Sequence, residues 1–449
     1  MTILKIKSLC LILFLLSFLL MHLGGSSIVN AGEKEVTYVK IQEKTYDKLI
    51  KGMALGSVVK GGQVEVYPKV IVLEDEVQFL DETGRIVSRK PLQSNTRREG
   101  EEYYGRTAIL SKRGNFVALY DYIGKSADVD YIVEQEYTIL NDRGEEIYKI
   151  KGLVEGKDWE DRLFISDKDG SAVETRIAYG AIDFYSPNGE MKTVPIFGEL
   201  GWGNRIANLA FSDDGEYLSV LVADRAKPAT GVLSFKADVW VILFDKNGIE
   251  LWRRKVDESQ IGNIAISKKG EYLIFKAYAI AGETPPKKGE HRDLASVTLA
   301  LYDKEGKGLN FNDVSLFSFG LFCFSPQADY VAIGGGNLIR LIKTKDGSTV
   351  YEKELPKDIA ITQLLFSDDG EYLIIRTRVP IGTEKITERA TTLERQYRTV
   401  YTDRVFLYNM NGDQVWYNDF FGLRGIFSKN AAIAFFCSSP DRYEIYKLK

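Results

Sequence analysis

The residues best suited to chemistry in this chain are two pairs of adjacent aspartates. The octapeptide FSDDGEYL occurs at 211–218 and again, unchanged, at 366–373, so Asp213-Asp214 and Asp368-Asp369 each lie beside a serine and a glycine. Paired carboxylates of this kind can bind Ca²⁺ or act as a general acid and base. They also occur in tight turns, where Asp and Ser bond to the backbone and Gly adopts a positive φ.

Five further segments are similar to this octapeptide, and they separate the two interpretations. The seven copies begin at residues 110, 165, 211, 266, 324, 366 and 427. The positions of the paired aspartates are occupied by Lys112-Arg113, Lys268-Lys269 and Pro326-Gln327 in three other copies. Lysine cannot coordinate a cation, and Ca²⁺ takes roughly six to eight oxygen ligands from one site. The pattern therefore favours a recurring turn, and we expect no metal site here.

A second motif alternates with the first. Its seven copies begin at residues 79, 139, 184, 243, 301, 342 and 407. Both motifs consist of an apolar run, a short polar turn containing Gly or a substitute, and a second apolar run, which is typical of a β-hairpin. We therefore interpret Asp245 and Asp303, in the second motif, as turn residues too. One copy of each motif gives four strands, named a to d, in about 40–60 residues, which is typical of a β-propeller blade.

The predicted fold is all-β. It is a seven-bladed β-propeller of four-stranded antiparallel blades over residues 64–449, preceded by a lead segment at 32–63. Eight blades are the alternative, if residues 36–73 contain additional strands. The C-terminal segments supply strands a to c of the last blade, and we expect 64–90 to supply its missing outer strand. Closure through both chain ends removes the open sheet edges.

The turn sequences resemble those of known repeat families. FSDDGEYL resembles the turns of bacterial WD40-like and TolB-like propeller repeats. FDKNGIELW and YNMNGDQVW are similar to quinoprotein-like (PQQ-like) repeats, in which a Trp follows the turn. The resemblance covers nearly the whole chain after residue 31 and implies a propeller. Gly-His and Trp-Asp dipeptides of true WD40 repeats are absent, and only Trp252 and Trp416 follow a turn, so we expect no quinone and no other cofactor.

Residues 1–31 have the pattern of a secretory signal peptide. Lys5 and Lys7 precede an apolar run that extends from Leu9 to Leu23, and Val29-Asn30-Ala31 provides a cleavage site. The alternative is an uncleaved membrane anchor. We expect an exported protein, periplasmic or extracellular, with no stable membrane insertion after cleavage. The net charge of −4 and the mixed signs along the chain argue against a nucleic-acid partner.

Histidine and cysteine are too scarce for several kinds of catalysis. After residue 31 the chain has one histidine, His291, and two cysteines, Cys323 and Cys437, which we expect to be buried free thiols. Ser-His-Asp and Cys-His mechanisms need a histidine beside a nucleophile, and zinc sites need several His or Cys ligands. We therefore assign no catalytic residue and no metal ligand.

The connectivity of the blades predicts two different faces. The short a–b and c–d turns of the two motifs share one end of the propeller, here called the turn face. The b–c and d–a connections share the other end, called the loop face, and the long insertions fall there, at 123–134, 224–237, 280–296 and 380–402. Because long loops on rigid scaffolds concentrate binding functions, we expect the loop face to bind. The insertion at 380–402, with Arg378 and Arg404 beside it, is predicted to form a protruding hairpin or a lid.

Two sets of residues are candidates for a ligand or partner surface on the loop face. The first is aromatic and comes from d–a loops: Trp159, Trp202, Phe319 and Phe421. The second set is taken from the position four residues before the first-motif serine or its equivalent, where we expect strand a to begin. This position is polar in six of the seven copies, and the exception is Leu321. The polar residues are Thr107, Arg162, Asn208, Asn263, Gln363 and Arg424. These groups suit an anionic, sugar-like or peptide ligand. The alternatives are that the aromatics pack between blades and that strand a is polar because it begins in solvent.

Two functions from different classes follow. The first is a binding scaffold that engages a protein or glycan partner through the loop face. The second is a carbohydrate-active lyase or hydrolase, which would require two acidic side chains roughly 5–10 Å apart at the channel mouth. A quinoprotein-like envelope-assembly factor is a further alternative. A peptidase is disfavoured because the chain has no Gly-x-Ser-x-Gly elbow.

Overall fold

The computed structural model of the protein describes sixteen stretches of the chain, all within one compact unit, Thr37–Lys449. They are residues 38–60, 63–97, 102–111, 113–126, 130–152, 163–176, 180–196, 204–224, 238–256, 260–280, 294–309, 320–385, 397–420, 423–429, 432–438 and 441–448. Strands and turns account for the regular structure in these stretches. No helix in them has the length and apolar character needed to cross a membrane.

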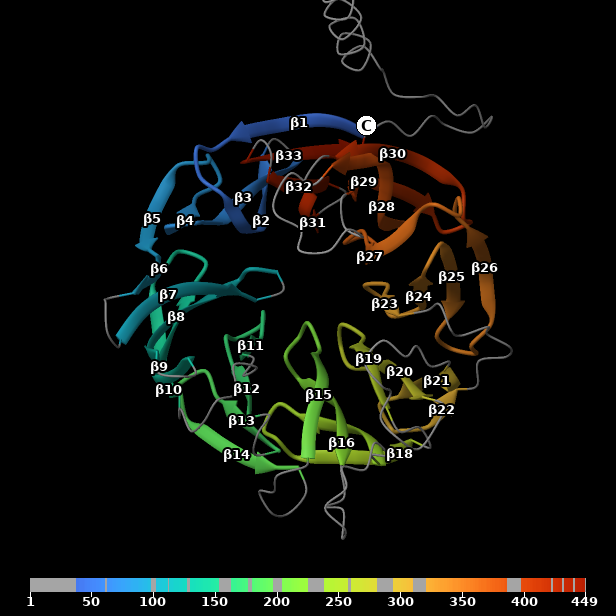
Figure 1. The fold of residues 1–449 in the computed structure, drawn as a ribbon, viewed down its shortest axis with the longest axis horizontal. Coiled ribbons are helices and arrows are strands. Elements are labelled where there is room, and N and C mark those ends of the chain that lie inside the picture. The colour runs from blue at the N-terminus through green and yellow to red at the C-terminus, as the bar shows by residue number, and fades with distance from the viewer. Residues whose placement is uncertain are drawn as a thin grey trace, which may run out of the picture. The chain divides into compact units, whose positions relative to one another are not determined.

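The described strands form eight antiparallel sheets, which succeed one another around a central axis as the blades of a β-propeller (Figure 1). Blades 1 to 4 are composed as follows. Blade 1 contains β2 (Ile50–Lys60), β3 (Gln63–Leu73), β4 (Glu76–Leu80) and β5 (Ile86–Pro91); blade 2 contains β6 (Gln93–Arg97), β7 (Glu102–Leu110), β8 (Phe116–Ser126), β9 (Asp130–Asn141) and β10 (Glu146–Gly152); blade 3 contains β11 (Leu163–Ile165), β12 (Ala172–Arg176), β13 (Ala181–Tyr185) and β14 (Met191–Pro195); blade 4 contains β15 (Asn204–Phe211), β16 (Tyr217–Asp224), β17 (Asp238–Asp245) and β18 (Glu250–Val256).

Blades 5 to 8 complete the ring, and blade 8 combines strands from the two ends of the chain. Blade 5 contains β19 (Gln260–Ile266), β20 (Tyr272–Ile280), β21 (Leu294–Asp303) and β22 (Gly308–Leu309); blade 6 contains β23 (Leu321–Phe324), β24 (Tyr330–Gly335), β25 (Leu338–Lys343) and β26 (Thr349–Glu354); blade 7 contains β27 (Ala360–Phe366), β28 (Tyr372–Lys385), β29 (Tyr397–Asn409) and β30 (Gln414–Phe420); blade 8 contains β31 (Leu423–Lys429), β32 (Ala432–Ser438), β33 (Asp441–Leu448) and β1 (Tyr38–Thr45).

The ring has eight blades, which is the alternative that the sequence left open, and the seven-bladed prediction is corrected. Blade 1 was missed because Lys60-Gly61-Gly62-Gln63 joins its first two strands without a Ser-x-x-Gly motif. The predicted closing strand is also corrected. Residues 64–90 belong to β3, β4 and β5, which form one sheet with β2. The strand that completes blade 8 is β1.

The two turn motifs form the hairpins that the sequence predicted. In the first motif of blade 4, the Gly215 N–H donates to the Ser212 carbonyl at 2.9 Å, and Gly215 has a φ of 70°. In the second motif of the same blade, the N–H groups of Asn247 and Ile249 donate to Asp245 Oδ1 at 2.9 and 2.7 Å. The Ser212 hydroxyl also accepts from the Tyr217 N–H at 3.0 Å, so in each motif one side chain, Ser212 or Asp245, closes the turn by bonding to the backbone.

The hydrophobic core lies between neighbouring blades. Between blades 3 and 4, for example, Val173 and Phe184 of one sheet pack with Val220 and Phe244 of the next. Polar contacts reinforce this packing: Trp252 Nε1 of blade 4 donates to the carbonyl of Lys304 in the c–d turn of blade 5, at 2.9 Å. Each blade therefore depends on its neighbours to bury its two faces.

The ring closes where β1 pairs with β33, in an antiparallel register from Tyr38↔Leu448 to Thr45↔Arg442, and an ionic network joins the two strands. The buried carboxylate of Glu444 lies 3.3 Å from Lys40 Nζ and 3.1 Å from an Arg442 nitrogen, and it accepts the Tyr446 hydroxyl at 2.7 Å. A buried carboxylate is stable only with partners of this kind. The network ties the N-terminal strand to the C-terminal one.

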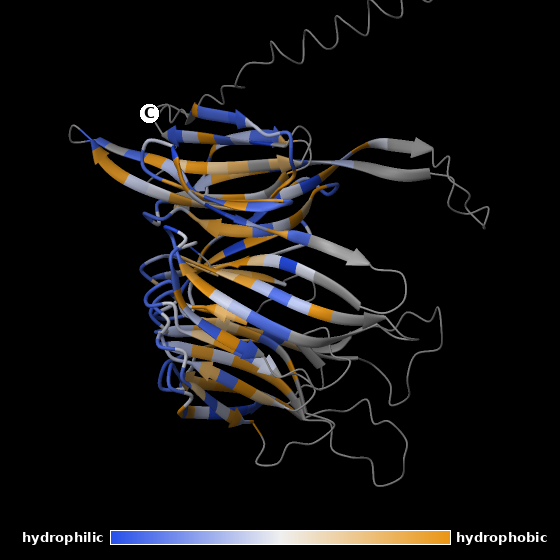
Figure 2. Ribbon diagram, turned by 90° about the vertical axis from the view of Figure 1, so that its left-hand side faces the viewer, coloured by the Kyte–Doolittle hydropathy of each residue, from blue (hydrophilic) through white to orange (hydrophobic). Residues whose placement is uncertain are grey.

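Figure 2 shows the short hydrophilic turns gathered at one side of the ring, as the connectivity predicted. This side is the turn face. On the loop face, β28 and β29 continue past their blade neighbours and pair with each other as far as Lys385↔Tyr397. The predicted protruding hairpin is thus present in the described parts of the insertion, 380–385 and 397–402.

Candidate functional site

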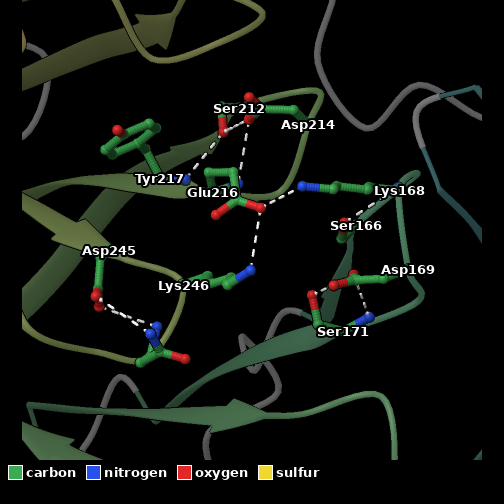
Figure 3. A network of polar contacts seen from close by, with 11 residues as sticks. Ser166, Lys168, Asp169, Ser171, Ser212, Asp214, Glu216, Tyr217, Asp245 and Lys246 are labelled. Carbon is green, nitrogen blue, oxygen red and sulfur yellow. Dashed lines mark hydrogen bonds and ion pairs between the residues drawn. The ribbon is translucent and has the colours of Figure 1, made fainter.

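The second aspartate of each FSDDGEYL copy is engaged within its own turn. Ser212 Oγ donates to Asp214 Oδ1 at 2.7 Å, and the Glu216 N–H donates to the same oxygen at 3.1 Å (Figure 3). In the second copy, Asp369 Oδ1 accepts from Ser367 Oγ at 2.5 Å and from the Glu371 N–H at 3.0 Å. Among the described residues, no cluster of His, Cys, Asp or Glu could hold a metal ion. The turn interpretation accounts for these carboxylates.

Other acidic side chains of the turn face join one blade to another. Asp167, in the first motif of blade 3, accepts from Ser111 Oγ at 2.5 Å and from the Arg113 N–H at 2.7 Å, both in blade 2. Arg113 also reaches Asp213 of blade 4 at 3.1 Å. Because these turns lie near the axis, side chains of three successive blades meet, and their charges neutralise one another.

Glu216 makes a second contact between blades, as Figure 3 shows. Lys168 Nζ of blade 3 lies 2.5 Å from its carboxylate, and Lys246 Nζ of blade 4 lies 3.1 Å from it. Hydrogen bonds from Lys168 and then Lys246 lower the pKa of Glu216, and the bond with Glu216 raises the pKa of Lys168. Both shifts favour the charged pair, which is what a contact that holds two blades together requires.

Part of the predicted polar ring comes together on the inner strands β15 and β19, in the middle of each strand and not at its start as predicted. Asn208 Nδ2 of blade 4 donates to Asn263 Oδ1 at 3.3 Å and to the Gly262 carbonyl at 3.4 Å. Asn263 Nδ2 in turn donates to the Gly320 carbonyl beside blade 6. The two asparagines therefore link three inner strands, a use that the sequence pattern did not distinguish from ligand binding.

The remaining polar positions differ from one another. Thr107 is exposed on β7, and Gln363 is half-buried on β27. Strand a is irregular at several of these positions, with bulges between Ile361 and Gln363 and between Leu423 and Gly425. A bulge re-aims side chains at a sheet edge, so the polar set coincides with a local change of strand direction. Arg424 lies on β31 at the second of these bulges.

Several predicted residues lie outside the described part of the chain, and for these the ligand-surface prediction stands as a prediction. They are Trp159, Arg162, Trp202, Phe319 and Phe421. His291 also lies outside the described residues. The two cysteines are described and neither forms a disulfide within the described residues; Cys437 is buried and Cys323 is half-buried. Burial raises the pKa of the Cys437 thiol to about 11, which opposes formation of a reactive thiolate.

A pair of carboxylates occurs in blade 3, but it does not have the surroundings that a glycosidase needs. Glu174 of β12 and Asp183 of β13 are direct cross-strand neighbours, with 3% and 0% exposure. Glu174 accepts from Gln135 Nε2 and from the Tyr185 hydroxyl, each at 3.0 Å, and Asp183 accepts from Thr193 Oγ1 at 2.6 Å. The pair is buried and hydrogen-bonded, so it does not favour the enzyme alternative.

The base of the β28–β29 hairpin is fixed by two arginines. Arg376 Nε donates to Asp403 at 2.9 Å, and another of its nitrogens donates to the Leu423 carbonyl of blade 8. Arg404 makes a two-point contact with Asp419 of β30, at 2.5 and 2.8 Å. Bidentate pairs of this kind hold their geometry well. The hairpin is therefore anchored to both neighbouring elements where it leaves the blade.

Above this base the hairpin exposes a mixed apolar and cationic surface. Ile381 is 56% exposed and Tyr401 is 46% exposed, and the exposed guanidinium of Arg378 lies 5.6 Å from the centre of the Tyr401 ring. We call Arg378, Ile381 and Tyr401 the hairpin patch. The sequence prediction did not single out Ile381 or Tyr401. The available signal was a large apolar side chain and an aromatic ring inside an insertion with no blade neighbour to cover them.

The protein is a closed β-propeller, and an anchored hairpin extends from its loop face. No family model matches the chain, and no curated protein matches its sequence. Solved structures do match. The "C-Terminal WD40 Domain Of Sif2" is 11% identical with a TM-score of 0.49, over 92% of this chain and 98% of that one. The "eukaryotic initiation factor" is 16% identical with a TM-score of 0.45, over 84% of this chain and 89% of that one.

A third match is the "Kuenenia stuttgartiensis Hydrazine Synthase", at 15% identity and a TM-score of 0.38, over 68% of this chain and 89% of that one. At these identities and TM-scores, the likenesses assign no activity or partner to this protein. The described strands form a propeller of eight antiparallel blades, seven with four strands and blade 2 with five, and this architecture is a rigid scaffold.

Proposed function

We propose that the protein is an exported binding scaffold that engages a protein or glycan partner through its loop face. The observation that carries this proposal is the hairpin patch, which is held away from the blade on an anchored pair of strands. An exposed isoleucine and tyrosine beside an arginine is the composition enriched at binding interfaces. The apolar N-terminal run at residues 9–23 supports export.

The contrast with the turn face supports the same choice. There Asp214 bonds within its own turn, and Asp167 and Glu216 bond to a neighbouring blade. The polar positions Thr107 on β7 and Gln363 on β27 belong to the predicted ligand surface. We expect them to contribute secondary contacts around the channel mouth.

The experiment compares two isoleucines of equal exposure on opposite faces. The full chain is screened against a glycan array and against a displayed library of random dodecapeptides. Binders are then tested with Ile381→Asp and with Ile249→Asp, a residue of the blade 4 c–d turn that is 54% exposed, against 56% for Ile381. We expect Ile381→Asp to weaken binding about tenfold or more, because it replaces the apolar side chain that the partner would cover with a charged one.

The control variant, Ile249→Asp, is expected to bind like the wild type. If Ile249→Asp weakens binding and Ile381→Asp does not, the turn face is the binding face and the proposal is wrong. Some binders could keep their affinity for both isoleucine variants and lose it with Thr107→Arg or Gln363→Arg. This result would place the contact at the channel mouth and not at the hairpin patch.

A further inference from the structure

The β28–β29 hairpin has two outer edges that differ in their capacity to pair with another strand. Pairing of β28 with β27 ends at Ala360↔Arg378, and pairing of β29 with β30 ends at Asp403↔Phe420. Beyond these points, among the described residues, the strands pair only with each other. Residues 379–385 and 397–402 therefore each present one free edge of backbone N–H and C=O groups.

The edge of β28 is blocked. Pro380 has no N–H to donate, and the register shifts between Pro380 and Gly382, which marks a bulge at Ile381. Proline and bulges are the devices by which sheet proteins protect an edge from pairing. The edge of β29 has neither device: Tyr397–Thr402 continues in regular register and reads YRTVYT, rich in the aromatic and β-branched residues that favour strands.

The register identifies the backbone groups that β29 offers. Pro380 lies directly opposite Tyr401. Because proline cannot donate to β29, this pair belongs to the class whose backbone groups point away from the partner strand. The N–H and C=O of Tyr401 therefore point outward. Because backbone groups alternate in direction along a strand, the N–H and C=O of Thr399 also point outward. Those of Asp403 point to the same side, toward Phe420, with which Asp403 pairs.

The charges beside this edge indicate the chemistry of an added strand. Arg378 is exposed and stacks on Tyr401, and none of the described carboxylates forms an ion pair with it. The two strands beyond the blade also contain Lys385 and Arg398, against one acidic residue, Glu384. A second copy of the chain would bring the same cations together across a two-fold axis, which disfavours self-pairing.

We propose that the outer edge of β29 at Tyr397–Thr402 receives an extended, acidic segment of a partner polypeptide as an added strand. Backbone hydrogen bonds at Thr399 and Tyr401 would give the affinity, and Arg378 would select carboxylates. This inference rests on the proposed binding function of the loop face and specifies the partner as a polypeptide.

The register supplies a matched pair of variants for the test, because Thr383 and Thr399 are directly opposite each other on the two edges. Thr399→Pro removes an outward N–H from the β29 edge, and Thr383→Pro makes the same chemical change on the edge that Pro380 already blocks. The probe is the random dodecapeptide library displayed against the full chain. We expect the recovered peptides to be acidic and free of proline.

The recovered peptides are expected to bind Thr383→Pro like the wild type and Thr399→Pro about tenfold or more weakly. Hydrogen exchange should show new protection of the Thr399 and Tyr401 amides in the complex. Equal binding by both proline variants, enrichment of basic peptides, or recovery of no peptide would overturn the inference. A dimer of the protein that Thr399→Pro abolishes would do so too, by showing that a second copy occupies the edge.

Failure of this inference is distinguishable from failure of the proposed function. If binders lose affinity with Ile381→Asp but not with Thr399→Pro, the loop face is supported as the binding face and strand addition is excluded. Binders that respond only to Ile249→Asp would exclude both.

Discussion

The two ends of this propeller use similar residues for opposite purposes. On the turn face, Asp167, Glu216 and Arg113 bond across blades, and their charges are neutralised within the protein. On the loop face, Arg378 is charged and exposed beside Tyr401 and Ile381. The arginine of one face completes the fold, whereas the arginine of the other is available to a partner.

This difference shows why acidic pairs in a repeat are poor evidence for a site. The repeated motif places its polar groups where every blade must turn, and the fold uses them there. The loop-face features are single occurrences: only blade 7 among the described blades has strands as long as β28 and β29. Function is better sought where one blade departs from the others than where all agree.

The largest effect on stability is expected from a glycine of the turn face. Gly114 has a φ of 67°, and a Cβ added there would lie 2.0 Å from the Ala54 Cβ of blade 1. Gly114→Ala should lower the free energy of unfolding by about 3 kcal/mol or more, since it adds a clash to the strained backbone. Gly84→Ala is the control, because Gly84 has a φ of 78° with nothing within 4 Å, and should cost roughly 1 kcal/mol.

Chemical denaturation of the two variants measures this difference. Equal losses of unfolding free energy for Gly114→Ala and Gly84→Ala would mean that the close contact between Gly114 and blade 1 does not contribute to stability.

Removal of an interblade carboxylate should have the next largest effect. Asp167→Ala leaves Ser111 and the Arg113 N–H without their acceptor in a buried position, so we expect a loss of about 2–3 kcal/mol. Asp346→Ala is the matched control, because exposed Asp346 bonds only within its own turn, to the Ser348 N–H. It should cost clearly less than Asp167→Ala. A comparable loss in the two unfolding curves would contradict the role given to Asp167.

A smaller, pH-dependent effect is expected from Glu216. Its pKa is lowered in the folded protein from the ordinary 4.5, so its ion pairs stabilise the fold above that value. This stabilisation is lost as the pH falls through the lowered folded pKa. Glu216→Gln should therefore cost under about 1 kcal/mol at neutral pH and nothing in acid. Unfolding curves across the acidic range test this, and a gap that persists in acid would exclude the ionic explanation.

The smallest effect on stability is expected on the loop face. Ile381→Asp changes an exposed residue at a bulge, so the free energy of unfolding should stay within about 0.5 kcal/mol of the wild type. The same variant is expected to weaken partner binding about tenfold. Thermal unfolding compared with the wild type checks the first statement, and a large loss of stability would show that the hairpin patch supports the fold.

The sequence predicted the features of this fold that repeat. Ser212, Asp245 and their equivalents have a strict spacing, because each blade needs a tight turn at the same two places. Blade 1 was missed for the same reason: Gly61-Gly62 replaces the serine motif there, so no repeat was counted. The strand β1 could not be assigned from local pattern alone, since its partner β33 is at the other end of the chain.

The candidate site was less accessible to sequence reasoning. The position of Asn208 and Asn263 on strand a could be read from the repeat, but their contacts with the next blade depend on how the blades pack. The hairpin at 380–402 was predicted from its length and charge. Its two unequal edges depend on which residue is opposite Pro380, and that register is set by pairing in three dimensions.

The pairing of β1 with β33 has a consequence for the order in which the protein is made. Lys40 and Glu444, which meet in blade 8, are 404 positions apart in the chain. A chain emerging from the ribosome has β1 without its partner until synthesis is almost complete, and contacts of such long range form slowly. Blade 8 is therefore the last sheet to be completed. A chain truncated before β33 would have an unclosed ring, and we expect it to be degraded or to aggregate rather than to accumulate as a smaller propeller.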